Sequence, residues 1–213
     1  ILSLNWDPGK TMEAVLGIKV GRSVTECWQD QSLWQTQAIA DYMVTAADGK
    51  IHHLSGPADE VVWQQTTCAD VEKLIHLLSQ IYPYIVLDLG HELSLPIMSA
   101  LSLTDRLALV TTPSPLSLRA AALQLQELTA GGVGPITCVV NRVPESTASE
   151  VAAQVKRVLE VESLEVANED EDLLATALEK RCLFSRTYGK SAIVRSLDYL
   201  TQELAVSPRP AKS

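Results

Sequence analysis

The sequence predicts an α/β fold in three layers, with a mostly parallel sheet between two layers of helices. Strand patterns alternate with helical patterns of roughly 10–15 residues, which is typical of parallel strands joined by helices. Several strands are apolar on both faces, as expected for strands that helices cover on both sides. Two strands end in a polar residue, Asp88 and Asn141, at the end where open α/β sheets bind ligands.

The first half of the chain supports this prediction element by element. An apolar run at the start predicts a strand, and Gly17 closes the short helical pattern that follows it. A longer helical pattern places five apolar residues on one face: Val71, Leu74, Ile75, Leu77 and Leu78. In order, we expect a strand over 1–6, a turn over 7–9, a helix over 11–16, mixed helix and loop over 24–43, a strand over 50–54, a helix over 68–81, a strand over 84–89 and a short helix over 95–103.

The second half continues the alternation. Its strongest helix, over 117–128, ends at a glycine-rich break over 131–134, and Ser146 can cap the helix that follows the next strand. We therefore expect one domain over 1–205 and a disordered tail over 206–213. The remaining elements are strands over 106–110, 136–140 and 163–166 and helices over 146–159, 172–178 and 191–204.

The composition fits a folded domain and argues against several other classes. The 213 residues are 46% hydrophobic and 20% charged, which is ample for a core. The net charge of −9 argues against general binding to nucleic acid or anionic membranes, although a local basic patch can do either. Four scattered cysteines argue against a zinc site and suit a reducing compartment. With no transmembrane run and no signal-peptide pattern, we expect a cytoplasmic location.

Four spaced segments point to one family. Residues 2–8 read L-S-L-N-W-D-P, 84–88 read Y-I-V-L-D, 110–113 read V-T-T-P with L-S-L-R at 116–119, and 140–142 read V-N-R. Together they resemble the MinD/ParA group of P-loop ATPases, most of all the branch with the pilus-assembly proteins CpaE and TadZ. Residues 191–200 also resemble a C-terminal pattern of this group, so the resemblance covers nearly the whole chain.

The resemblance implies ATP and Mg²⁺ as cofactors. Asp88 corresponds to the carboxylate that holds Mg²⁺ through its water shell, because this cation prefers oxygen ligands and keeps its waters. Asp7 corresponds to a catalytic Asp that positions the attacking water, with an ordinary Asp-Pro-Gly turn as an equal alternative. Asn141 corresponds to the residue that reads the adenine edge through its amide. The other residues that the resemblance places beside the nucleotide are Arg142, Thr112 and Pro113.

The sequence also departs from the family pattern. Asn5 replaces the first Asp of the D-x-D-P segment, and an amide cannot balance a cation as a carboxylate does. The stretch 166–170, which matches the loop that partners Asn141, lacks the family's proline. Lys10 and Lys190 follow glycines as in a phosphate loop, but Leu4 and Phe184 stand where that loop needs another glycine. We therefore expect the family's first strand, phosphate loop and first helix upstream of Ile1, with a degenerate loop over 4–11 as the lesser alternative.

These features leave three functional hypotheses. The first is an ATP-hydrolysing switch that forms a homodimer around nucleotide and positions a bacterial pilus or secretion machine at a cell pole. The second is a localisation scaffold of the same fold that no longer hydrolyses ATP, motivated by Asn5, by Val166-Ala167 and by the absence of a complete phosphate loop. The third is a DNA-partition ATPase that uses the basic stretch 180–195, for which a solvated face is the simpler interpretation. The proline-containing end of the chain does not predict an amphipathic membrane helix.

Overall fold

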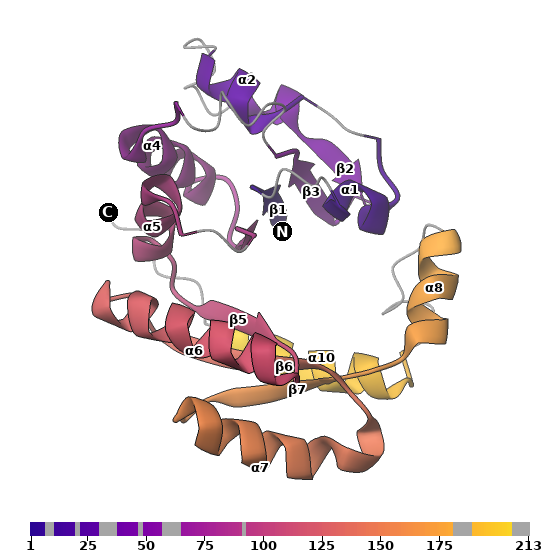
Figure 1. The fold of residues 1–213 in the computed structure, drawn as a ribbon. Helices are drawn as coiled ribbons and strands as arrows, with labels where there is room; N and C mark the ends of the chain where they lie inside the picture. The colour runs from indigo at the N-terminus through magenta and orange to yellow at the C-terminus, as the bar shows by residue number, and fades with distance from the viewer. Residues whose placement is uncertain are drawn as a thin grey trace. The chain divides into compact units, whose positions relative to one another are not determined.

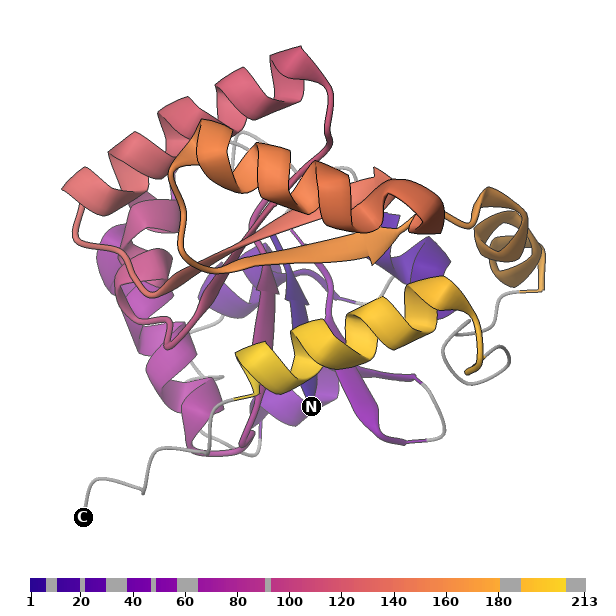
Figure 2. The ribbon, with the colours of Figure 1, turned by 90° about the horizontal axis from the view of Figure 1, so that it is seen from below.

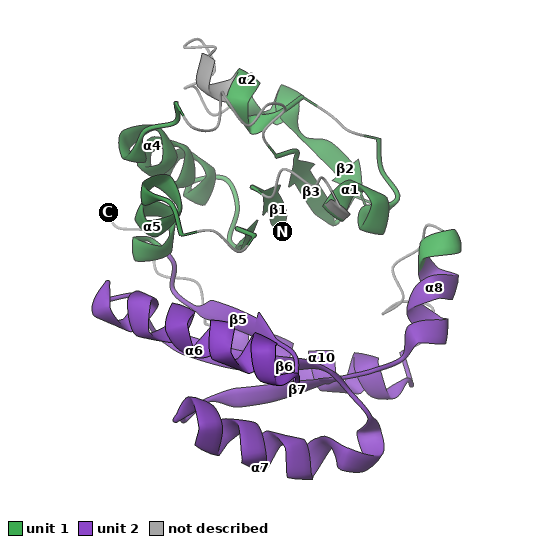
Figure 3. Ribbon diagram, viewed as in Figure 1, with its two compact units in different colours: residues 1–103, 178–183, 210–213 green, residues 104–177, 184–209 purple. Residues whose placement is uncertain are grey.

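The computed structural model describes residues 1–6, 11–19, 22–29, 38–46, 49–56, 65–90, 93–180 and 189–205. The chain divides into two compact units, residues 1–103 with 178–183 and 210–213, and residues 104–177 with 184–209 (Figure 3). Each unit has its own sheet. The expected single domain over 1–205 stays a prediction, and the expected disordered tail over 206–213 lies outside the described residues.

The first unit is built on a four-stranded sheet in the order β2-β3-β1-β4 (Figure 1). The central strand β1 (Leu2–Asn5) is parallel to both β3 (Ile51–Leu54) and β4 (Ile85–Asp88). The short edge strand β2 (Val44–Ala46) pairs antiparallel with β3. The sequence did not predict β2, because a strand of three residues has too short a pattern to recognise.

Helices cover one face of this sheet and form the core of the first unit. α4 (Cys68–Ser79) begins with a capping box in which Thr67 and Asp70 bond each other's backbone N–H groups. Its buried face, predicted from the sequence, packs with Leu2, Leu4 and the neighbouring helix α5 (Leu95–Ser102). The unit also contains α1 (Thr11–Leu16), α2 (Val24–Gln29) and the 3-10 helix η2 (Ala38–Tyr42).

The second unit contains a three-stranded parallel sheet in the order β5-β6-β7. Its strands are β5 (Leu107–Thr111), β6 (Ile136–Val143) and β7 (Leu164–Asn168). β7 lies between α7 (Ala148–Leu159) and α10 (Ala192–Leu204), as Figure 2 shows, while α6 (Pro115–Ala130) packs on β5 and α7. α8 (Glu171–Glu179) follows β7, and the side chain of Asp170 accepts a hydrogen bond from Leu173 N in its first turn.

Two details of the second unit differ from the sequence-based expectation. The prediction that Ser146 caps α7 is wrong, because a 3-10 turn over Glu145–Thr147 precedes the helix and Thr147 is its N-cap residue. β6 also continues beyond Val140, through an irregularity at Asn141 and Arg142, and resumes its pairing at Val143. The expected α/β fold with mostly parallel sheets and flanking helices is confirmed.

Both sheets end in a parallel edge strand of apolar residues. Among the described residues, β4 pairs only with β1 and β5 pairs only with β6. Val86 on β4 is 57% exposed and Val110 on β5 is 60% exposed. Parallel strands are normally covered on both faces, so such exposed valines are unusual for parallel strands. Within the described ranges, no helix is both long and apolar enough to cross a bilayer.

Candidate functional site

In the first unit, strand register brings Asn5 and Asp88 together. β1 and β4 run parallel with Asn5 opposite Asp88, and Trp6 N donates a hydrogen bond to Asp88 O over 2.8 Å. Because side chains alternate along a strand, both residues lie on the face opposite the leucine core. Asn5 is completely buried, whereas Asp88 is half-buried and reachable by solvent. Gly90, with φ of 68°, turns the chain just beyond Asp88 in a conformation that suits glycine.

The half-buried carboxylate of Asp88 is a hard ligand that fits a Mg²⁺ ion keeping most of its waters, whereas Asn5 is completely buried. No cluster of three or more His, Cys, Asp or Glu side chains occurs in the described ranges, so a fully protein-bound metal is not supported there. Asp88 would therefore hold the ion beside substrate phosphates, and the neutral Asn5 adds no charge to balance it.

In the second unit, the four predicted nucleotide-binding residues lie at one sheet edge. Thr111 pairs with Val140 in register, so Thr112 and Asn141 follow on neighbouring strands at the same end. Pro113 and Arg142 come next in the chain and are exposed. The structure thus brings together Thr112, Pro113, Asn141 and Arg142, as the sequence predicts for carboxyl ends of parallel strands.

A β-bulge shapes this edge. The pairing of β6 with β7 shifts between Val140 and Val143, and Arg142 has φ of 60°, in the left-handed region. The Asn141 side chain oxygen accepts a hydrogen bond from Arg142 N over 2.9 Å. The side-chain oxygen of Asn141 therefore stabilises the bulge. The same hydrogen bond fixes the orientation of the Asn141 NH₂ group. Bulges commonly redirect side chains beside binding sites.

Two supporting residues were not recognised from the sequence. Thr112 Oγ1 donates to Ser117 Oγ over 2.9 Å, which ties the end of β5 to the first turn of α6. Asn168 N donates to Ser196 Oγ over 3.2 Å, which ties β7 to α10. Serines in helical patterns are too common to signal such a role. A serine soon after a strand-end threonine is the only sequence feature that points to Ser117.

The stretch expected to partner Asn141 is mostly strand rather than loop. Val166, Ala167 and Asn168 belong to β7, and Asn168 is 9% exposed. Its Nδ2 donates to Val143 O over 3.3 Å, so its side chain joins β6 to β7. The predicted catalytic residue Asp7 lies outside the described residues. Gly189–Ser191 is not a phosphate loop, because Ser191 is the N-cap of α10 and accepts from Val194 N.

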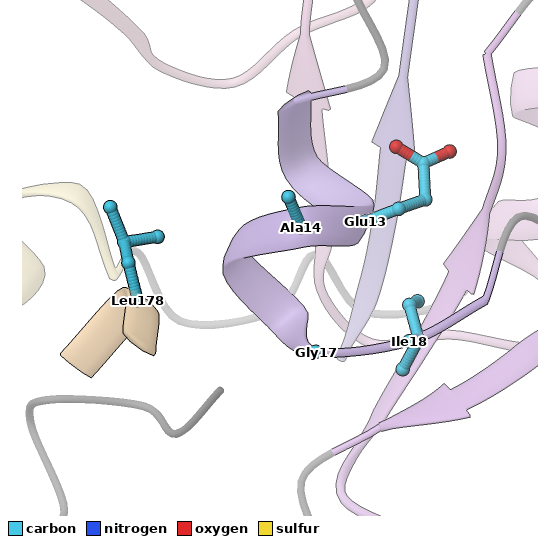
Figure 4. Close-up of a pocket in the computed structure, with 5 residues that line it drawn as sticks. All are labelled: Glu13, Ala14, Gly17, Ile18 and Leu178. Atoms are coloured by element: carbon cyan, nitrogen blue, oxygen red, sulfur yellow. The ribbon is translucent and has the colours of Figure 1, made fainter. Parts of the chain in front are cut away.

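A pocket of about 280 Å³ lies beside α1, away from these residues in the chain (Figure 4). Glu13, Ala14, Gly17, Ile18 and Leu178 line it. None of the predicted nucleotide-site residues is among them. The pocket is therefore not the site that the sequence predicts.

Mostly parallel sheets flanked by helices, with polar residues at the carboxyl ends of their strands, match the P-loop NTPase-like fold of MinD and ParA proteins. The chain is similar to the ParA family ATPase from Chlorobium tepidum TLS, with a TM-score of 0.80 and 21% identity over 95% of this chain and 85% of that one. It is also similar to MinD from Aquifex aeolicus, with a TM-score of 0.72 and 17% identity over 100% of this chain and 86% of that one. For MinD from Pyrococcus horikoshii OT3, complexed with Mg-ADP, the TM-score is 0.72 and the identity 19%, over 95% of this chain and 82% of that one. At these identities the likeness shows a shared fold.

The sequence comparisons add nothing to this structural likeness. No protein-family profile matches the sequence, and no curated protein matches it significantly.

Proposed function

We propose that the protein is a nucleotide-dependent switch of the MinD/ParA kind, with ATP and Mg²⁺ as ligands. One observation carries the proposal: in each sheet, neighbouring parallel strands end in the polar residues that the family pattern places at the nucleotide, Asn5 beside Asp88 and Thr112 beside Asn141. The Mg-ADP complex of a MinD with the same fold supports the choice of ligand.

The proposal includes a phosphate-binding segment outside the described residues. It is supported by the edges of β4 and β5, because within the described ranges neither strand has a second neighbour and their exposed valines, Val86 and Val110, can contact a further strand. In the finer form of the proposal, the switch forms a nucleotide-dependent homodimer in the cytoplasm. It positions pilus or secretion machinery, as its resemblance to the CpaE and TadZ branch implies.

A second candidate is a scaffold that binds nucleotide without turning it over. The completely buried Asn5 favours it, because Asp88 is then the one carboxylate at the ends of β1 and β4 among the residues that the structure describes. The DNA-partition hypothesis gains nothing comparable, since residues 181–188 of its basic stretch lie outside the described residues and the net charge is −9. Salt-sensitive DNA binding would revive that hypothesis.

The first test is calorimetry of ATP binding with and without Mg²⁺. It compares this chain with a chain extended upstream to the start of its gene. Binding by the extended chain alone, strengthened by Mg²⁺, supports the switch. Absence of binding by both chains, with both folded, overturns it and leaves a scaffold that needs no nucleotide.

Two variants of the extended chain sharpen this test. Asp88→Asn should remove most of the strengthening by Mg²⁺ while leaving the metal-free affinity nearly unchanged. Asp198→Asn, at an exposed position on α10, is the matched control and should behave as wild type. Hydrolysis by a chain that binds ATP then separates the switch from the scaffold.

A further inference from the structure

The outward face of α6 carries an exposed apolar stripe. Leu116 is 83% exposed and Leu123 is 52% exposed, although the opposite face of the same helix packs into the core. Ala120 lies between them and is also exposed. Because residues four and seven positions apart share one side of a helix, the three side chains form one stripe. Among the described side chains of the helices, α6 alone carries two large exposed apolar residues.

The surroundings of α6 leave this stripe available for a contact. The helix packs on β5 and beside α7, over a core that it shares with α7 (Figure 2). Its stripe lies on the side away from that core. The helix has 16 residues, which corresponds to a length of about 24 Å. A continuous apolar patch of this kind commonly marks a site of protein–protein contact.

Two opposite charges stand symmetrically about Leu123. Arg119 comes four residues before it and Glu127 four residues after it, and both are exposed. The three residues form one row with a spacing of four, which is the ridge that packed helices most often use. Arg119 and Glu127 are eight residues apart, beyond the spacing at which side chains of one helix pair with each other. This ridge is therefore complementary to one with the same charges in reverse order.

A second copy of α6, turned through a twofold axis near Leu123, presents that reversed order. In such a contact the same patch faces itself. The ridges of the two helices run side by side when the helices cross at about −50°. Arg119 of each copy then lies beside Glu127 of the other copy. The small side chain of Ala120 leaves room beside the ridge for the partner's Leu123.

We propose that α6 forms a contact between two copies of this chain, through Leu123 and the reciprocal pairing of Arg119 with Glu127. One helix from each copy makes a small interface, so we expect a weak dimer with a dissociation constant of roughly tens to hundreds of micromolar. At low micromolar concentration the chain is then mostly monomeric. The contact needs no nucleotide, so it stands or falls separately from the proposed function.

Sedimentation velocity over a range of about 10–500 µM tests the contact, because it resolves dimers from larger aggregates. The wild-type chain without nucleotide should shift from monomer towards dimer as its concentration rises. Leu123→Gln should weaken this association at least about tenfold, since it removes an apolar side chain from the centre of the contact. Val158→Gln, at a position on α7 that is 55% exposed, is the matched control and should associate as wild type. A wild-type chain that forms no dimer, or equal association by Leu123→Gln, would overturn the proposal.

Reversal of the charges tests the orientation of the two helices. Arg119→Glu and Glu127→Arg should each weaken the dimer by about three- to tenfold, because each places like charges side by side. The variant with both substitutions should regain the wild-type association, because the charges are again complementary. Circular dichroism should show the wild-type fold in all three variants, since both positions are exposed. If the double variant associates as weakly as the single ones, Arg119 does not face Glu127 and the proposed contact is wrong. Association through the exposed edge strands would not respond to these substitutions.

Discussion

At the residue scale, the amide of Asn5 stands where a carboxylate would place a second negative charge beside Asp88. It is completely buried and lies opposite Asp88 across the β1–β4 pairing. Asn5→Asp should lower the stability of the nucleotide-free protein by about 1–3 kcal/mol, because it buries a carboxylate beside another. Thermal unfolding should detect a fall in Tm of about 3–9 °C.

The matched control for this substitution is Asn141→Asp. Asn141 is only half-buried, and its oxygen already accepts from Arg142 N, as a carboxylate oxygen also can. The fall in Tm caused by Asn141→Asp should be less than half of that caused by Asn5→Asp. Equal losses in both variants would mean that burial of Asn5 is not the cause.

Glu165 on β7 gives a prediction about pH. Desolvation by burial, and secondly the charge of Glu203, raise the pKa of the Glu165 carboxyl above its ordinary value. The folded state therefore binds its proton more readily than the unfolded state, so stability falls as pH rises from about the ordinary value of 4.5 through the raised one. Glu165→Gln should flatten this fall and raise Tm near neutral pH by about 1 °C.

Glu203→Gln is the companion variant, because it removes the smaller cause of the same shift. It should change the pH dependence in the same direction but by less. A larger effect from Glu203→Gln than from Glu165→Gln would contradict the assignment of burial as the main cause.

At the element scale, the bulge in β6 stores backbone strain. Arg142 has φ of 60° and Glu160, at the end of α7, has φ of 54°, and both conformations favour glycine. Arg142→Gly should stabilise the protein by up to about 1 kcal/mol while weakening nucleotide binding by the extended chain. Denaturant unfolding and calorimetry measure the two effects.

Glu160→Gly separates strain from function. It should give a similar gain in stability and leave nucleotide binding unchanged, because Glu160 lies at a helix end and not at the carboxyl edge of the sheet. If Arg142→Gly binds nucleotide as tightly as wild type, the side chain of Arg142 has no place in the site.

The elements differ in how far the sequence could predict them. α4 was predictable because its apolar residues repeat at helical spacing, whereas its capping box at Thr67 was recognised only in the structure. The strand ends at Asp88 and Asn141 were predictable because each polar residue follows an apolar run. The bulge was not, because it depends on pairing with β7, which lies more than a helix away in the chain. The approach of Glu13 Oε1 to His53 Nε2, over 3.4 Å, was missed because nothing in the spacing of α1 and β3 indicates that the two side chains meet.

At the scale of the whole molecule, the proposed switch predicts a change in mass. The extended chain should be monomeric without nucleotide and dimeric with ATP and Mg²⁺, measured by light scattering coupled to size-exclusion chromatography. Asp88→Asn should shift this transition to higher nucleotide concentration, because it weakens the hold on the metal. A mass that nucleotide does not change would contradict the dimer, even if ATP binds.

The exposed edge strands β4 and β5 have a practical consequence for the production of this polypeptide. Exposed parallel strands with valines such as Val86 and Val110 are templates on which other chains can stack. The polypeptide alone should therefore enter inclusion bodies or form clumps as its concentration rises. A strand added to either edge would cover its valine and should raise the yield of correctly folded protein.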